Sequence, residues 1–321
     1  MKKVSLNSLM ARNPALFTSI LLITVVLVNA AVQPNLLKLD TLNSNLRVFL
    51  PMILLAVGQT FVMMGGGIDI SVGGIVSIVN TILATQVGLN GSMEDMWMFV
   101  GISLLAGIAA GAINGFFIAV LRLQPIITTY ATGFIYAGVA LFILPNPGGG
   151  IPRAAADFYR TTTPLGIPLA FYIIGAMLLM WWYIRSTRYG RYLFAVGGKA
   201  EAAYQTAVPV NKVLFSTYVI SGLMAAFAGI AITLLSGSGN AEIGSAMTLT
   251  AITAAVIGGT AMSGGIGGVA GPIMGALVIS LIQNIISFAN INTWWETLIK
   301  ALIIVVALAM PGIINLFGRK R

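Results

Sequence analysis

The sequence contains no cysteine and no histidine, and it has few charged residues. The first two absences exclude disulfides, thiol nucleophiles, Cys/His metal sites and histidine-based catalytic triads or proton relays. Charged side chains make up 8% of the 321 residues, whereas they make up roughly 25% of a soluble domain. A soluble globule of this length could not cover its surface with so few charges. The composition therefore predicts a polytopic membrane protein and excludes the soluble enzyme classes.

The sequence also lacks a nucleotide-binding motif. Its Gly198-Lys199 pair is followed by Ala200, so the phosphate-binding pattern G-x4-G-K-[ST] does not occur. No other constellation of residues indicates a catalytic centre. We therefore expect no enzymatic activity, no metal site and no cofactor bound by this chain.

Long apolar runs dominate the sequence, because 58% of its residues are hydrophobic. A run of about 20 apolar residues is long enough to cross the hydrocarbon core of a bilayer. We predict an all-α polytopic membrane protein that forms a single transmembrane domain over residues 1–321. Its ten predicted spans are 15–32, 46–64, 69–87, 97–121, 125–144, 166–184, 213–235, 247–263, 269–288 and 294–313.

The positive charges orient these spans. With the N-terminus in the cytosol, 12 of the 17 Lys and Arg residues fall on the cytosolic side and four fall outside. This bias predicts that both termini are cytosolic. The basic residues belong to loops between spans and do not form a groove-facing patch. We therefore expect the protein to contact membrane lipid and not to bind nucleic acid.

Two glycine patterns indicate a weak internal repeat. Three glycines spaced four residues apart occur in 107–115 and again in 267–275. Spans two to five and seven to ten therefore resemble two halves. Five spans separate equivalent positions, so the halves would be inverted in the membrane, an arrangement common in transporters.

Asp69 is the acidic residue of the first half that lies deepest in an apolar context. The three glycines at 65–67 precede it and permit a helix break, and Ser71 follows two residues later. In one interpretation Asp69 caps the N-terminus of the third span. In the other it belongs to a broken helix that lines a polar pathway. The two interpretations are compatible. Asn114 also has two interpretations: it forms an interhelical hydrogen bond, or it contacts a polar solute.

Three motifs resemble one known family. The segment 66–73 reads GGIDISVG and resembles the GGIDLSVG signature of ribose-type sugar permeases of ABC importers. GAING at 111–115, followed by LRLQP at 121–125, is similar to that family's fourth and fifth spans. VIGGT at 256–260 and SGGIG at 263–267 resemble its late glycine signature. The matches follow the family order, so the chain resembles the branched-chain amino acid/ribose permease family.

The resemblance implies a role for residues 185–212. In this family the cytosolic loop after span six contains an EAA-like coupling helix that docks on the ATPase subunit. The positions implied here for ATPase coupling are Gly197, Gly198, Glu201, Ala202 and Ala203. Family members usually carry glycine just before the position of the pair Val208-Pro209, where this chain has Ala207. That departure puts the local turn geometry in doubt.

The function implied by the resemblance is that of a membrane permease subunit in a binding-protein-dependent ABC importer. The solute would be a monosaccharide or a related neutral polyol. Expected partners are an ATPase subunit that binds ATP and Mg, a second copy or a homologous permease, and a soluble sugar-binding protein. The binding protein would meet outer loops near 145–165 and 236–246. The expected location is the bacterial cytoplasmic membrane. For the translocation path we expect Asp69, Ser71, Asn114 and Thr128.

An ion-coupled secondary carrier that works without an ATPase is the alternative function. Its candidate ion-binding residues are Asp69, Glu242 and Glu296, and Glu296 is spaced to pair with Lys300 on one helix face. The 185–212 loop distinguishes the two functions, because a secondary carrier does not need an EAA-like element.

Overall fold

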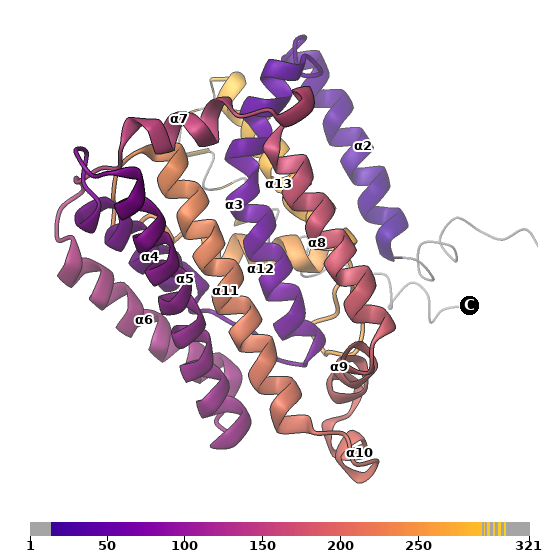
Figure 1. Cartoon of the computed structure of the whole chain (residues 1–321). Coiled ribbons are helices and arrows are strands. Elements are labelled where there is room, and N and C mark those ends of the chain that lie inside the picture. Colours follow the sequence, from indigo (N-terminus) through magenta and orange to yellow (C-terminus); the bar gives the residue numbers. More distant parts are fainter. Residues whose placement is uncertain are drawn as a thin grey trace, which may run out of the picture.

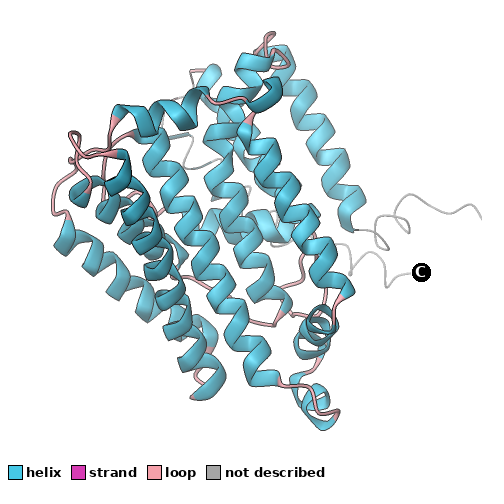
Figure 2. Cartoon of the chain, viewed as in Figure 1, coloured by secondary structure: helices cyan, strands magenta, loops and turns pink. Residues whose placement is uncertain are grey.

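The computed structural model describes residues 14–290 and, beyond them, 292, 294, 295, 298, 301, 302 and 305. The predicted tenth span, Glu296, Lys300 and both termini lie largely or wholly outside these residues. The described part of the chain consists of helices and loops (Figure 2). Its only β contact is an isolated bridge between Gly148 and Gly239. The fold is therefore that of an all-α protein.

Nine of the predicted spans coincide with helices of the described residues (Figure 1). These are α2 (Pro14–Val32), α3 (Leu39–Met64), α4 (Val72–Gln86), α5 (Met93–Gly115), α6 (Pro125–Ile143), α8 (Leu169–Ser186), α11 (Val210–Ser236), α12 (Met247–Ile257) and α13 (Ala270–Phe288). A π-helical turn, η1 (Phe116–Val120), continues α5.

Six of these segments are long and apolar enough to cross a membrane, namely α3, α5 with η1, α6, α8, α11 and α13. The apolar helices α2, α4 and α12 are shorter. The described chain is thus a multi-pass membrane protein. Its ten crossings, the inverted repeat and the cytosolic termini stay predictions.

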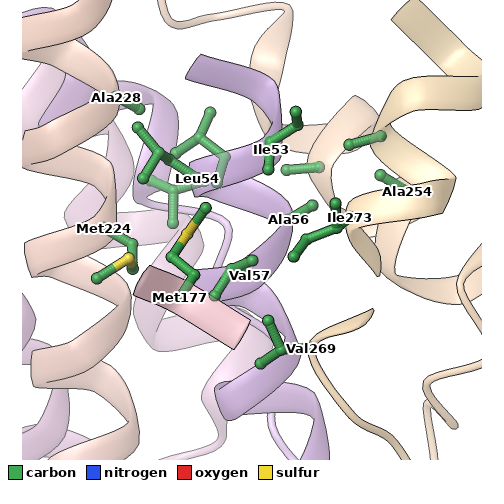
Figure 3. Close-up of a cluster of buried hydrophobic side chains, with 14 of the residues drawn as sticks. Ile53, Leu54, Ala56, Val57, Met177, Met224, Ala228, Ala254, Val269 and Ile273 are labelled. Atoms are coloured by element: carbon green, nitrogen blue, oxygen red, sulfur yellow. The ribbon is translucent and has the colours of Figure 1, made fainter. Parts of the chain in front are cut away.

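Helix α3 lies at the centre of the fold. In its most apolar 18-residue window, 83% of residues are buried, compared with 17% in α8 and 28% in α5 and α6. Figure 3 shows Ile53 and Val57 of α3 among side chains from other helices, including Met224 of α11 and Ile273 of α13. A helix that is apolar on all sides is expected in such a position. The outer helices instead present apolar side chains outward, as lipid contact requires.

The two glycine patterns, in 107–115 and 267–275, contain residues at which helices pack closely together. A Cβ at Gly107 would overlap the carbonyl group of Gly222 in α11, so α5 and α11 approach each other at backbone distance. Similarly, in α13 a Cβ at Gly275 would overlap the Ala254 carbonyl of α12, and a Cβ at Gly271 would overlap the carbonyl of Gly258, the C-cap of α12. Small residues permit this close approach in membrane helices.

Shorter helices lie at opposite ends of the helix bundle (Figure 1). At one end, α7 (Arg153–Thr161) and the 3-10 turn η2 (Pro164–Gly166) occupy the predicted outer loop. At the other end, α9 (Arg188–Gly198) and α10 (Ala200–Gln205) occupy the predicted 185–212 loop. The second loop therefore contains two short helices.

Candidate functional site

The predicted break between the second and third spans is present. Helix α3 ends at Met64, and Gly66 has a left-handed φ of 87°. The Gly67 amide donates to the Val62 carbonyl at 3.0 Å, and the Gly66 amide donates to the Met63 carbonyl at 2.9 Å. These two bonds form a Schellman C-cap, for which glycine is the favoured left-handed residue. The chain then stays non-helical until α4 begins at Val72.

The carboxylate of Asp69 lies in this break and is fully buried. Its Oδ1 accepts from the Ser71 amide at 2.9 Å and from Ser71 Oγ at 2.6 Å. Its Oδ2 accepts from Ser221 Oγ of α11 at 2.8 Å. Asp69 therefore accepts a backbone N–H bond just before α4, but the N-cap residue of α4 is Ser71 and not Asp69 as predicted. The break also receives a hydrogen bond from a distant helix.

Two further helices extend this network. Asn114 of α5 donates from Nδ2 to Ser71 Oγ at 2.7 Å, and it accepts at Oδ1 from Thr132 Oγ1 of α6 at 2.7 Å. Thr129 Oγ1 of α6 accepts from the Ile70 amide at 3.1 Å. The side-chain hydroxyls and the amide thus satisfy polar groups that have no access to water, as a buried network must.

Gln59 of α3 contributes a further contact to the break. With its amide group oriented so that nitrogen faces the Asp69 carbonyl, Gln59 donates to that oxygen at 3.1 Å and accepts from the Asp69 amide at 3.2 Å. This paired arrangement satisfies the backbone of a non-helical residue inside the protein. We call Gln59, Asp69, Ser71, Asn114, Thr129, Thr132 and Ser221 the break network.

Three of the four predicted path residues meet in this network. Asp69, Ser71 and Asn114 are all 0% exposed. Thr128 is 7% exposed, and its hydroxyl donates to the carbonyl of Gln124, the N-cap residue of α6. Their role in lining the path stays a prediction. The sequence interpretation missed Gln59, Thr129, Thr132 and Ser221. The signal available for them was a polar side chain inside an apolar run.

The predicted coupling residues divide into an outward and an inward group. Glu201 and Ala202 of α10 and Gly198 of α9 are exposed, whereas Gly197 and Ala203 are buried. The exposed side of α10 also carries Tyr204, which is 74% exposed. α10 therefore has a surface available to a partner and a face that fixes it to the rest of the chain. These five positions stay predictions for ATPase coupling.

Ala207 adopts the conformation that is usually left to glycine, with φ of 61°. The Val208 amide donates to the Ala203 carbonyl at 3.2 Å, and the Ala207 amide donates to the Tyr204 carbonyl at 3.0 Å. This is again a Schellman cap, and its usual apolar pair is formed by the buried Ala203 and Val208. The turn geometry that the departure from glycine put in doubt is kept, with a left-handed alanine in it.

The predicted coupling segment, residues 188–208 with α9 and α10, touches the break directly. Gly197 packs so closely that a Cβ would overlap the Met64 carbonyl at the end of α3. The amide of Gly265, in the loop after α12, donates to the same carbonyl at 3.0 Å. The neighbouring Gly264 would also overlap Gly197 if it carried a Cβ. Met64, Gly197, Gly264 and Gly265 form what we call the glycine junction.

The two predicted outer loops meet at the opposite end. Gly148 and Gly239 exchange two backbone hydrogen bonds of 3.0 and 2.9 Å. The Gly150 amide donates to the Ala84 carbonyl of α4 at 2.9 Å, and the Arg160 guanidinium of α7 donates to the Leu235 carbonyl of α11. Residues near 145–160 and 235–240 therefore form one continuous surface. Among the described residues, no group of three or more Asp and Glu side chains could hold a metal ion.

Comparison with known proteins gives consistent matches over nearly the whole chain. Residues 41–308 match the family described as the branched-chain amino acid transport system permease component. The chain is 30% identical to the ribose import permease protein RbsC of Haemophilus influenzae, over 94% of this chain and 93% of the relative. It is 29% identical to RbsC of Escherichia coli K12, with 91% and 92% covered.

A third relative has a different name. The autoinducer 2 import system permease protein LsrD of Photorhabdus temperata is 29% identical, over 90% of this chain and 88% of the relative. No solved structure was found to match the chain.

Proposed function

Because the chain belongs to the family of branched-chain amino acid transport system permease components, we propose that it forms the translocation path of a binding-protein-dependent ABC importer. The solute is a monosaccharide or a related neutral polyol. The names of the relatives support this class, since they are ribose and autoinducer 2 import permeases. A chain with 8% charged residues also suits a neutral solute better than an ionic one.

The observation that carries the proposal is the glycine junction. Helix α9, which leads directly into α10 at the predicted cytosolic end, contacts the end of α3 at Gly197 through backbone atoms with no side chain between them. Movement of α10 would therefore be transmitted to the break between α3 and α4 without being absorbed by flexible side chains. This is the connection that an ATPase-driven permease requires.

The proposed docking surface for the ATPase subunit is the exposed side of α10. It presents Glu201, Ala202 and Tyr204, and Gly198 lies next to it at the end of α9. Gly197 and Ala203 would act from the inner side, by holding the segment against the bundle. The ATPase subunit would bind ATP and Mg. Contact of Asp69, Ser71, Asn114 and Thr128 with solute would require the packing around the break to open during transport.

The remaining partners and the topology follow from the same proposal. A second copy or a homologous permease completes the path, and a soluble sugar-binding protein docks on the outer surface formed by 145–165 and 236–246. The joining of these loops by the Gly148–Gly239 bridge supports a single docking surface. We further propose ten spans with both termini cytosolic, two inverted halves, and location in a bacterial cytoplasmic membrane.

The ion-coupled alternative receives less support from the site. The carboxylate of Asp69 accepts three hydrogen bonds from Ser71 and Ser221, which is a structural use of this group. Glu242 is exposed, and Glu296 lies outside the described residues. The exposed α10 has no evident use in a carrier that works alone.

Purification of the tagged chain from native membranes in mild detergent tests the proposal. Identification of the co-purifying polypeptides should give a P-loop ATPase in stoichiometric amount, because the exposed side of α10 would bind it. A second permease in the eluate would mean a heterodimer. Recovery of the chain alone, with solute accumulation driven by an imposed ion gradient, would overturn the importer assignment.

A further inference from the structure

A non-helical segment, residues 237–246, runs alongside helix α4. Asn80 of α4 accepts at Oδ1 from the Asn240 amide at 2.6 Å and donates from Nδ2 to the Ser238 carbonyl at 3.1 Å. One turn earlier in α4, Ser77 Oγ accepts from the Gly244 amide at 3.2 Å. Side chains of α4 therefore satisfy backbone groups that a helix would satisfy by itself.

The contacts continue to the first turn of α4. The Gly73 amide donates to Thr248 Oγ1 at 3.1 Å, and Gly73 lies so close to Gly244 that a Cβ on either residue would overlap the other's backbone. At the opposite end of the helix, a Cβ at Gly239 would touch Ala84. The contacts thus run from Gly73 to Ala84 of α4, a length of about 17 Å at 1.5 Å per residue.

Because α4 belongs to a predicted span, this course takes irregular backbone from the predicted outer loops to the depth of that span. Non-helical backbone at that depth is stable where it is buried in protein or where it lines a water-filled cavity. The inner side of the segment is covered by α4. Its other side is not covered by the part of the chain that the structure describes, because Glu242, Ser245 and Ala246 are exposed.

The exposed side of the segment carries the carboxylate of Glu242, which indicates whether this side faces lipid or water. A carboxylate at the centre of the hydrocarbon costs about 2.5–3.5 kcal/mol on insertion scales, so acidic side chains in membrane proteins face a cavity or the bundle interior. Glu242 lies between Asn240 and Gly244, both of which are fixed to α4. Its side of the segment therefore borders water.

We propose that Glu242 and Ser245 form the outer wall of the solute path and bind hydroxyl groups of the transported polyol. This inference rests on the importer function proposed above, and it adds a site to it. The Glu242 carboxylate accepts hydrogen bonds from two sugar hydroxyls, and the Ser245 hydroxyl both donates and accepts. The Ser245 amide donates to the Glu242 carbonyl at 3.1 Å, so one tight turn holds both residues. The break network lies sealed behind α4 and supports the wall.

Cysteine labelling tests whether this wall faces water, and the chain offers a cysteine-free background. Glu242→Cys and Ser245→Cys are introduced singly into the tagged permease in native membranes and treated from outside with a charged, membrane-impermeant thiol reagent. Leu179→Cys in α8 is the lipid-facing control, since Leu179 is 68% exposed on the least buried of the long spans. Ser103→Cys is the buried control, since Ser103 is 0% exposed.

We expect Glu242→Cys and Ser245→Cys to react at least tenfold faster than both controls. Reaction no faster than that of Leu179→Cys would overturn the proposal, because the segment would then face lipid or protein. This measurement does not depend on transport, so it separates the position of the wall from the function of the chain.

A second measurement tests solute binding. Uptake of labelled ribose is measured with Glu242→Gln and with the matched control Glu94→Gln, which alters an exposed carboxylate in the first turn of α5. Glu242→Gln should raise the KM for uptake five- to tenfold, with kcat and ATPase activity within twofold of the unmodified complex. Glu94→Gln should leave the KM unchanged.

Two failures remain distinguishable. An unchanged KM in Glu242→Gln, in a complex that takes up ribose with ATP, overturns the binding role of Glu242 and leaves the importer function intact. Absence of ATP-driven uptake of ribose and other neutral sugars by the unmodified complex overturns the proposed function, whatever the labelling shows.

Discussion

The break at 65–71 and the predicted coupling segment at 188–208 both contain a helix end followed by non-helical backbone. In both, the backbone polar groups need hydrogen-bond partners, but the surroundings of the two segments differ. Each has a Schellman cap at a helix end, with Gly66 in the left-handed position of one and Ala207 in that of the other. At the break, Gly66 is exposed, but Gly67, Asp69 and Ser71 are buried, and the break exchanges hydrogen bonds with three other helices. The α10 cap lies at the surface, where Ala207 is exposed. Buried irregular backbone is thus fixed by side chains from distant segments, whereas surface irregular backbone is fixed by local bonds.

The strongest test of this contrast is removal of the buried carboxylate. Asp69→Leu would leave the Ser71 amide, the Ser71 hydroxyl and the Ser221 hydroxyl without an acceptor, and each unsatisfied group costs roughly 1–3 kcal/mol. We expect a loss of at least about 3 kcal/mol, measured as a lower melting temperature of the detergent-solubilised chain. The control is Ser103→Ala, which removes a buried hydroxyl that has no partner and should change little. A melting temperature of Asp69→Leu equal to that of the control would contradict the network.

The next largest effect is expected at the glycine junction, where the two regions meet. Gly197→Ala forces a methyl group into the Met64 carbonyl, whereas Gly198→Ala places one where nothing lies within 4 Å. Overpacking of this kind costs typically 1–3 kcal/mol. Thermal melting of both variants should show a clear loss for Gly197→Ala and a change within about 0.5 kcal/mol for Gly198→Ala. Equal melting temperatures would mean that the junction is loose.

A smaller effect of opposite sign is expected at Ala207. The left-handed conformation costs roughly 1–2 kcal/mol for a residue with a Cβ, and glycine avoids this cost but increases the entropy of the unfolded chain. Ala207→Gly should therefore raise the free energy of unfolding by up to about 1 kcal/mol. Ala202→Gly, inside α10, is the matched control and should lower it by a similar amount. Destabilisation by Ala207→Gly would show that the turn is unstrained.

The smallest effect on stability is expected at Glu201, which is exposed on α10. Glu201→Arg should insert and melt as the unmodified chain does, because its side chain has no buried surroundings to disturb. In the complex it should uncouple ATP hydrolysis from uptake by placing a positive charge on the docking surface. Parallel assays of ATPase activity and uptake check this, with Glu94→Arg at the other end of the bundle as control. Coupling at the level of the unmodified complex would refute the docking assignment.

The bounds of the predicted spans agree with those of the helices where a local sequence signal, such as proline, marks the end of the helix. Span 125–144 corresponds to α6 (Pro125–Ile143), because proline is favoured at the first turn of a helix. Span 46–64 was too short, since α3 begins at Leu39 with polar residues that hydropathy does not detect. Span 247–263 was too long as a helix. Its cap at Gly258 and Gly259 ends α12 at Ile257.

Only those features of the site that involve residues close together in the sequence could be predicted. The glycines at 65–67 indicated the break, and the sequence placed the hydroxyl of Ser71 two residues after Asp69. The bond from Ser221 joins residues 152 positions apart, and no local pattern identifies such a partner. The same holds for Asn80 and Ser77, which hold the segment 237–246 through bonds over 158 or more positions. Packing of distant helices decides these contacts.

The central claim is that this chain moves solute only when an ATPase acts on its coupling segment. Ribose uptake into proteoliposomes containing the purified complex and its binding protein tests it most directly. Uptake is compared with ATP and Mg supplied at the ATPase side and with an imposed proton or sodium gradient. We predict accumulation with ATP and Mg, and none with either gradient alone. Accumulation driven by a gradient in the absence of ATP would contradict the claim.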